Sequence, residues 1–230
     1  MYNNFLELIK NESDEKYREF SLKITPNMGK SVGIRTPILK NFAKEAAKGD
    51  WQEFFEKRNN ELYEEKLVSG FIICYIKENI DVRLDLLREF IPIIDNWAIC
   101  DMVACAFKFK KAEREKVWDF VNEYIEKNGE FEKRFAVVMI LAHFIDEKHI
   151  DEILKMLNNI DDEKFYVSMA VAWALSVCYI KYREKTVNAL KCTSLSSDTI
   201  NRTVSKIKQS RRVDEEGKRQ TELLKDIKEF

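Results

Sequence analysis

Trp97 and Asp101 stand four residues apart in this chain. If the segment is a helix, the indole and the carboxylate lie on the same face. The flanking segments, 91–94 and 102–105, are apolar, and aspartate is seldom buried in such surroundings without a partner. The carboxylate therefore has either a structural partner or a chemical task, such as stabilising positive charge.

The rest of the chain predicts the helices that position these two residues. Only six glycines and three prolines interrupt it, and apolar residues recur mostly every three or four positions. We therefore expect an all-α protein. The helices fall into pairs whose first members begin about 31 to 36 residues apart, a period typical of stacked helical repeats. The predicted pairs are 61–79 with 81–92, 95–107 with 112–128, 130–145 with 147–158, 161–182 with 183–192, and 197–211 with 213–228.

Upstream of these pairs, residues 1–24 predict two short helices, 25–29 predict a loop, and 37–48 predict a helix with Pro37 in its first turn. No low-complexity linker divides the chain, so we expect residues 1–230 to form a single domain, an α-α solenoid. The first helix of each pair is the more apolar, which favours a place between neighbours on the concave face. Polar residues on these first helices are therefore candidates for function.

Two further candidates lie on such helices, Arg134 on the one after Trp97 and Trp173 on the next. Stacking of the repeats would bring all four side chains to one cleft. From the residues alone a structural reading is simpler: the tryptophans as core aromatics, and Asp101 with Arg134 as an ion pair between neighbouring helices.

Basic residues cluster at several predicted helix ends, although the net charge of −1 does not itself indicate a nucleic-acid partner. Such clusters are usually solvated helix ends, and they form a phosphate-binding surface only if they share one face. The candidates for DNA binding are Lys108, Lys133, Lys181, Arg183, Lys206, Lys208, Arg211 and Arg212.

Composition suggests a soluble cytoplasmic protein. The five cysteines are an odd number without a CxxC pair, as expected for buried free thiols. No signal peptide and no long uncharged apolar run is found. His143 is expected in the core and His149 near a helix start, so neither predicts a metal site. Gly29-Lys30-Ser31 lacks the upstream glycine and strand of a phosphate-binding loop. We expect no cofactor.

Several segments together resemble the AlkD-like DNA alkylation repair glycosylases, which are built from HEAT-like repeats. The resemblance runs over most of the chain, through Val32-Gly33-Ile34-Arg35-Thr36-Pro37, Asn96–Asp101, Lys133-Arg134-Phe135-Ala136 and Ala170-Val171-Ala172-Trp173-Ala174-Leu175. It implies a HEAT-like superhelix with a concave DNA-binding face and a catalytic cleft made of Trp97, Asp101, Arg134 and Trp173.

The resemblance also implies an activity: excision of cationic alkylpurines, such as 7-methylguanine and 3-methyladenine, from double-stranded DNA. In this family the damaged base is left exposed rather than inserted in a tight pocket, unlike in base-flipping enzymes. Asp101 would stabilise the positive sugar and position water, the tryptophans would hold the cationic nucleoside, and Arg134 would contact a phosphate. We expect a monomer that needs no metal.

One departure keeps other functions open. Many members of the family place an arginine on the turn after the second tryptophan, whereas here Ser176-Val177-Cys178 follow Trp173. That phosphate contact is either missing or supplied by Lys181, Arg183 or the segment 206–212. The alternatives are a catalytically inactive HEAT-like scaffold that binds DNA or a protein, and a peptide-binding solenoid.

Overall fold

The computed structural model describes residues 1–224, which contain fourteen α-helices, three short 3-10 helices and one isolated β-bridge. The chain has the all-α helical-repeat architecture that its sequence predicts. Its internal contacts define two compact units, Met1–Phe120 and Val121–Phe230, and the division falls inside helix α8 (Arg114–Ile125). The single-domain organisation and the concave face stay predictions.

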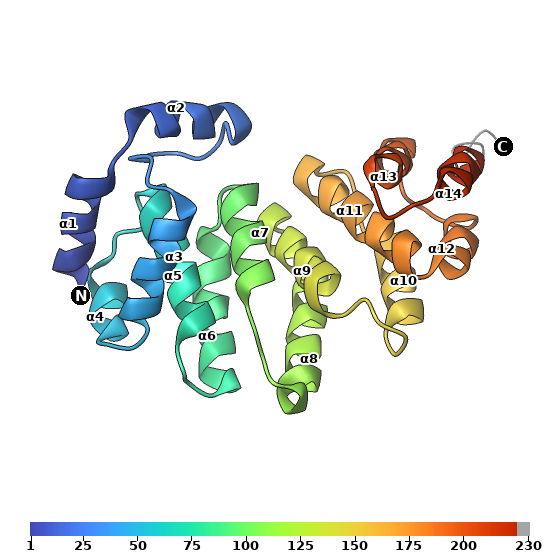
Figure 1. The fold of residues 1–230 in the computed structure, drawn as a ribbon. Coiled ribbons are helices and arrows are strands. Elements are labelled where there is room, and N and C mark those ends of the chain that lie inside the picture. Colours follow the sequence, from blue (N-terminus) through green and yellow to red (C-terminus); the bar gives the residue numbers. More distant parts are fainter. Residues whose placement is uncertain (225–230) are drawn as a thin grey trace. The chain divides into compact units, whose positions relative to one another are not determined.

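The first unit is a row of packed helices. Helix α5 (Tyr63–Tyr75) lies between α3 (Thr36–Ala46) and α7 (Trp97–Ala106), as Figure 1 shows. Nearly all of α5 is buried, and α7 approaches it so closely that a Cβ at Gly70 would come within 2.3 Å of Val103 Cγ2. The remaining elements are α1 (Tyr2–Glu12), α2 (Glu15–Ile24), α4 (Trp51–Lys57), α6 (Ile80–Phe90), and the 3-10 helices Ile91–Ile93 and Lys111–Glu113.

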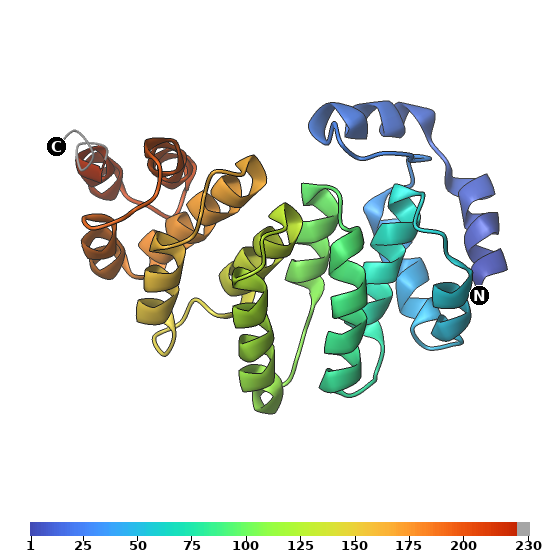
Figure 2. The same cartoon turned by 180° about the vertical axis from the view of Figure 1, so that it is seen from behind.

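The second unit repeats this arrangement. Helix α11 (Phe165–Lys181) packs between α9 (Glu130–His143) and α13 (Ser197–Gln209), and α10 (Ile150–Asn158) packs against α12 (Arg183–Leu190) (Figures 1 and 2). Most of α11 is buried. Helix α14 (Glu215–Gln220) and the 3-10 helix Thr221–Leu224 end the described chain.

The spacing of the helices confirms the repeat. The first helices of the five pairs begin at residues 63, 97, 130, 165 and 197, which are 32 to 35 residues apart. Most boundaries agree with prediction within three residues, but α11 begins four residues later and α5 ends four residues earlier than expected. The short helix α4 was not predicted. The predicted helix 213–228 is two short helices as far as Leu224, and its last residues lie outside the described part of the chain.

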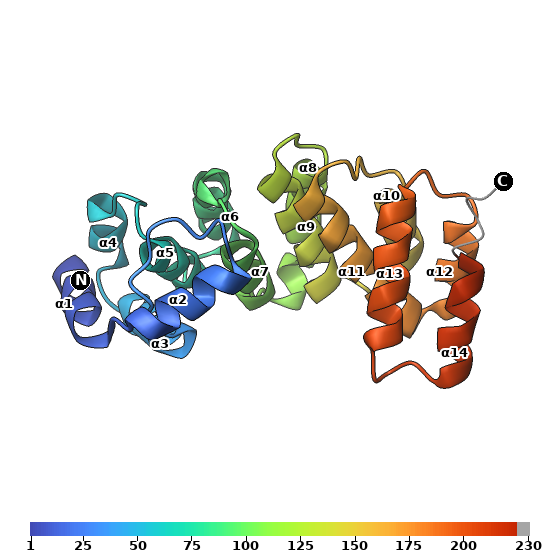
Figure 3. The same cartoon turned by 90° about the horizontal axis from the view of Figure 1, so that it is seen from above.

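A buried glutamate anchors the loop that leads into α3. Glu64, on the first turn of α5, is 1% exposed, and its Oε1 accepts hydrogen bonds from the Ser31 hydroxyl at 2.7 Å and from the backbone N–H of Gly33 at 2.8 Å. The N–H groups of Val32 and Ile34 donate to the same oxygen at 3.1 and 3.3 Å. Helix α2 contacts this loop through the N–H of its N-cap Asp14, which donates to the Val32 carbonyl at 3.1 Å. In Figure 1 it lies across the upper ends of the helices of this unit (Figures 1 and 3).

Gly33 allows that close approach. Its φ is +79°, and a Cβ there would lie 2.1 Å from the carbonyl oxygen of Asp14, the N-cap residue of α2. The motif Val32–Pro37 therefore has an architectural role, since it joins α2, α3 and α5.

The cysteines are free thiols. Cys74, Cys100 and Cys178 are buried, Cys105 is half-buried and Cys192 is exposed. Burial raises the pKa of the Cys74 and Cys178 thiols to about 12. No helix among residues 1–224 is both long and apolar enough to cross a membrane.

Candidate active site

The start of α7 is fixed by a chain of polar contacts. Asn96 is fully buried, and its side-chain oxygen caps the helix by accepting the N–H of Ile99 at 3.0 Å. Its amide donates to Asp95 Oδ1 at 2.9 Å, and Asp95 Oδ2 accepts from Lys66 Nζ of α5 at 2.5 Å. The first turn of α7 is thereby tied to α5, and this turn carries Trp97.

Trp97 and Asp101 share the accessible side of α7, as the spacing predicts. Both are half-buried, whereas the three residues between them, 98–100, are buried. The Asp101 carboxylate is therefore neither sealed in the core nor fully solvated. An anion in this position keeps access to solvent water while part of its surroundings is of low polarity, which strengthens its electrostatic effect.

The pKa of the Cys105 thiol, one turn after Asp101, depends on the charged groups around this side of α7. Burial raises the pKa of this thiol, and the negative charge of Asp101 raises it further. Lys108 and Lys40 act in the opposite direction. Lys40 belongs to α3, so the charged groups near Asp101 come from two helices as well as from the chain just after α7.

Arg134, in the second unit, is a largely buried cation. Its side chain leaves α9, Nη1 donates to the carbonyl oxygen of Tyr166 on α11 at 2.7 Å, and the guanidinium lies 5.9 Å from the centre of the Tyr166 ring. A second contact joins the same two helices, since Glu130 of α9 accepts a hydrogen bond from the Tyr166 N–H at 2.8 Å. At 5% exposure, Arg134 fixes the first turn of α11 and presents little surface to a ligand.

Trp173 lies two turns after Tyr166 on α11, and both are half-buried. With Met169 and Val177 they form the accessible stripe of a helix that is otherwise mostly buried. Ser176, on the turn after Trp173, is buried, and its hydroxyl donates to the carbonyl oxygen of Trp173 at 2.7 Å. Trp97 and Asp101 belong to the first unit, Arg134 and Trp173 to the second, so their convergence on one cleft stays a prediction.

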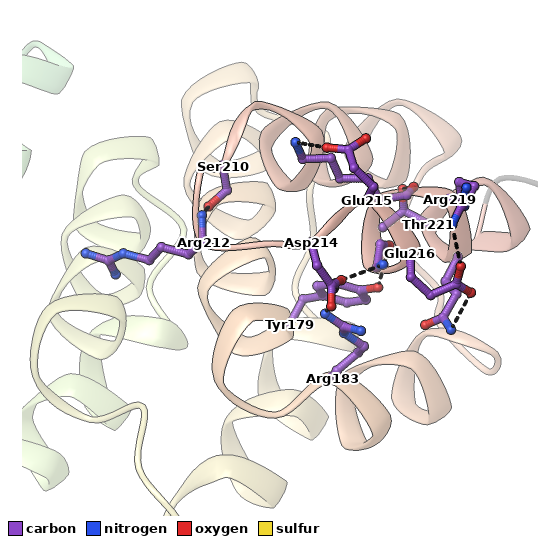
Figure 4. A network of polar contacts seen from close by, with 12 residues as sticks. Tyr179, Arg183, Ser210, Arg212, Asp214, Glu215, Glu216, Arg219 and Thr221 are labelled. Carbon is purple, nitrogen blue, oxygen red and sulfur yellow. Dashed lines mark hydrogen bonds and ion pairs between the residues drawn. The ribbon is translucent and has the colours of Figure 1, made fainter.

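The predicted DNA-binding residues of the second unit differ in their surroundings. Arg183 forms an ion pair with Asp214 at 3.1 Å and lies 5.5 Å from the ring of Tyr179, whereas Arg212 points away from this network (Figure 4). Lys181 donates to the carbonyl oxygen of Ile145 at 2.8 Å. Arg211 and Arg212 are exposed. Lys206 and Lys208, on the last turn of α13, are half-buried.

Lys133 and Arg134 diverge although they are neighbours in sequence. Lys133 lines a cavity of about 500 Å³ together with Glu126 and with Glu152 and Lys155 of α10, whereas Arg134 reaches α11. Successive residues of a helix point about 100° apart, which explains the difference. The structure therefore does not place these two basic residues on one surface.

The two histidines lie near the ends of helices α9 and α10. His149 is 3% exposed at the N-cap position of α10, and its Nδ1 lies 2.7 Å from Asp146 Oδ1. His143, expected in the core, is half-buried at the end of α9. Among the described residues no three or more His, Cys, Asp or Glu side chains form a set that could hold a metal ion.

The fold and these side chains define a helical-repeat protein with an aromatic and carboxylate pair on an accessible helix face. A comparison with protein families identifies the class further. The model of the DNA alkylation repair enzyme family matches residues 5–206, and the chain belongs to that family. No curated protein and no solved structure matches the chain. The family gives the protein a role in DNA alkylation repair and implies that it binds DNA.

Proposed function

We propose that the protein is a DNA glycosylase that releases cationic alkylated purines, such as 7-methylguanine and 3-methyladenine, from duplex DNA. The observation that carries the proposal is the position of Asp101, half-buried one turn after Trp97 on a helix whose start is tied to α5. Membership of the DNA alkylation repair enzyme family makes this carboxylate a candidate for chemistry rather than for structure.

The reaction is the hydrolysis of an N-glycosidic bond. Alkylation of a ring nitrogen leaves the purine positively charged, so the base is a good leaving group. When the bond between C1′ and nitrogen breaks, both electrons go to the base, which departs neutral, and positive charge develops on the sugar. Oxygen of a water molecule then bonds to C1′, and the water gives up a proton. Water is the only co-reactant.

Asp101 has two tasks in this reaction. Its negative charge attracts the positive sugar, and its oxygens orient the attacking water by accepting a hydrogen bond from it. At roughly 4 Å and an effective dielectric constant near 20, the attraction is about 4 kcal/mol. If it acts only in the transition state, it accelerates the reaction about a thousandfold.

Trp97 and Trp173 would hold the cationic nucleoside against their indole faces, where the cation–π attraction is about 0.5 to 2 kcal/mol. Arg134 is suited to a phosphate, although its burial leaves only part of the guanidinium for that contact. The base would stay exposed, which tolerates bulky adducts and favours charged ones. Binding would depend on the duplex backbone and weaken steeply with salt.

The test is base release from a duplex oligonucleotide that carries a single 7-methylguanine. We expect release of 7-methylguanine and none of hypoxanthine from a matched duplex, because hypoxanthine carries no positive charge. Release of both bases at similar rates would contradict the electrostatic mechanism.

The second candidate is a HEAT-like scaffold that binds DNA without excising bases. The segment Ser176-Val177-Cys178 favours it, because it holds no arginine for the phosphate contact that the family resemblance implies after Trp173. Salt-dependent binding of the duplex with no base release would decide for the scaffold. Absence of DNA binding would remove both functions.

A further inference from the structure

Two lysines of α3 lie over two aromatic rings of α5. Lys40 Nζ is 5.2 Å from the centre of the Phe71 ring, and Lys44 Nζ is 5.7 Å from the centre of the Tyr75 ring. The two rings stack on each other, with centres 6.2 Å apart and planes 22° apart. Because each pair is spaced by four residues, the lysine row and the aromatic row run in register along the two packed helices.

The end of α5 is tied to the chain that follows α7. The buried Arg83 donates to the carbonyl oxygens of Ile73, Cys74 and Lys108 at 3.1, 3.2 and 2.9 Å. This brings the backbone of Lys108 beside the last turn of α5, the turn that carries Tyr75. Lys108 itself is exposed.

Two of these lysines, Lys40 and Lys108, act on the surroundings of Asp101. The Thr36 hydroxyl, one turn before Lys40 on α3, is 3.9 Å from the sulfur of Met102, the residue after Asp101. Lys40 and Lys108 both act electrostatically on the Cys105 thiol, and so does Asp101. Lys40, Lys108 and the candidate catalytic anion therefore belong to one region of the first unit, and Lys44 follows one turn after Lys40 on α3.

Among the described residues no carboxylate neutralises these three lysines, whereas several others in the unit are ion-paired. Lys48, Lys57 and Lys66 form ion pairs with Glu45, Glu53 and Asp95 at 2.7, 2.7 and 2.5 Å. Within residues 1–224, no carboxylate oxygen lies within 4.0 Å of the Nζ atom of Lys40, Lys44 or Lys108. The rings beneath Lys40 and Lys44 hold the ammonium groups in place without cancelling their charge.

We propose that Lys40, Lys44 and Lys108 form a binding site for phosphates of the DNA strand that carries the lesion. This inference rests on the proposed function, and it adds a site to it. An aspartate next to a polyanion repels it, so Asp101 requires cations nearby if a damaged strand is to approach. Lys40 and Lys44 are about 6 Å apart along the helix axis, a separation that suits neighbouring phosphates of one strand.

The test measures binding of an undamaged duplex of about 20 base pairs by fluorescence anisotropy between about 50 and 200 mM salt. The logarithm of the binding constant falls as the logarithm of the salt concentration rises, and each lost phosphate contact makes this negative slope shallower by about 0.9. We expect the slope of the double variant Lys40→Gln/Lys44→Gln to be shallower than that of the wild type by about 1.8. Over this salt range the wild-type affinity then falls about twelvefold further than that of the variant.

A matched control is Lys10→Gln/Lys127→Gln, which removes the same charge elsewhere. Lys127 also lies over an aromatic ring, with Nζ 5.9 Å from the centre of Tyr124, but unlike Lys40 and Lys44 it has a carboxylate nearby, with Glu123 Oε1 at 3.9 Å. We expect the control to keep the wild-type slope and Lys40→Arg/Lys44→Arg to retain binding. Thermal unfolding of each variant checks the fold.

A wild-type slope in Lys40→Gln/Lys44→Gln, or an equal decrease in the control, would overturn the phosphate site. So would competition by an acidic peptide as effective as that by DNA, because it would indicate a protein partner. The duplex in this assay is undamaged and contains no base for the enzyme to release, so these results are independent of glycosylase activity. If 7-methylguanine is not released but the slope becomes shallower as expected, the phosphate site stands and the proposed reaction fails.

Discussion

Replacement of Glu64 by alanine tests how the first unit holds its N-terminal part. The carboxylate accepts the Ser31 hydroxyl and three consecutive backbone N–H groups, those of Val32, Gly33 and Ile34, and it is almost completely buried. Alanine removes this acceptor from all four donors, and only the Gly33 N–H keeps another one, Ser31 Oγ at 3.2 Å. Each unsatisfied buried donor costs about 1 to 3 kcal/mol, and because the four contacts form one network their costs do not add fully.

We therefore expect Glu64→Ala to lower the free energy of unfolding by about 3 to 5 kcal/mol. Glu64→Gln keeps one acceptor oxygen and should cost about 1 to 2 kcal/mol. Urea unfolding measures the global effect, and amide hydrogen exchange at residues 32–34 measures the local one. The exchange readout is needed because two compact units need not unfold together.

Glu12→Ala is the control, since Glu12 is exposed at the end of α1. It should change stability by less than about 0.5 kcal/mol. The reasoning is refuted if Glu64→Ala and Glu12→Ala unfold at the same urea concentration and residues 32–34 exchange as slowly as in the wild type.

Three further predictions follow from particular residues. Gly33→Ala should destabilise the protein by at least about 2 kcal/mol in urea unfolding, because its Cβ would meet the Asp14 carbonyl. The control Gly29→Ala, at φ +71° with open space around it, should cost about 1 kcal/mol. Equal costs for the two variants would contradict the steric argument. The Lys57 ammonium and then the N-terminal amine lower the pKa of Glu53 from its usual 4.5 to about 2. The stability this adds is present above pH 4.5 and is lost as the pH falls toward 2, so Glu53→Gln should flatten the acid limb of unfolding; an unchanged limb would count against the ion pairs. In the native protein near pH 8, a thiol reagent followed by mass spectrometry should modify Cys192 first and leave Cys74 and Cys178 intact, because burial raises the pKa of both buried thiols to about 12; early labelling of Cys74 would contradict the packing of α5.

The helical repeat could be predicted from the sequence because it depends on local patterns. The apolar period predicts the start of α13 at residue 197 and that of α7 within two residues, and the side chains of Ser196 and Asn96 cap these two helices. The start of α11 was predicted too early because Asp161 and Asp162 do not cap it. Asp161 accepts the N–H of Glu163, and Asp162 accepts the N–H and the hydroxyl of Ser196. These contacts stabilise a loop.

The sequence of helix α4 contains a capping residue and apolar residues at helical spacing. Asp50 caps it by accepting the N–H of Glu53 at 3.1 Å, and Trp51, Phe54 and Phe55 follow at helical spacing. Its seven residues are too few for the apolar period to be distinctive.

The candidate site was only partly predictable. The shared face of Trp97 and Asp101 follows from their spacing alone, but the surroundings of a side chain depend on tertiary packing. Two glutamates on the first turn of a helix, Glu64 and Glu65, look like solvated residues, yet both are buried. Glu64 accepts hydrogen bonds from the loop 31–34, and Glu65 accepts them from the Tyr2 hydroxyl of α1 and from the N–H groups of residues 59 and 60. In the same way, nothing near Lys40 in the sequence indicates the aromatic ring of α5 beneath it.

The most direct test of the proposed reaction is single-turnover release of 7-methylguanine by the wild type and by Asp101→Asn, with enzyme in saturating excess over DNA. Asparagine keeps the size of the side chain and removes its charge. We expect the release rate to fall about a thousandfold, with duplex affinity unchanged or higher because a negative charge has been removed. An Asp101→Asn variant that releases the base at the wild-type rate would contradict the central role of this carboxylate.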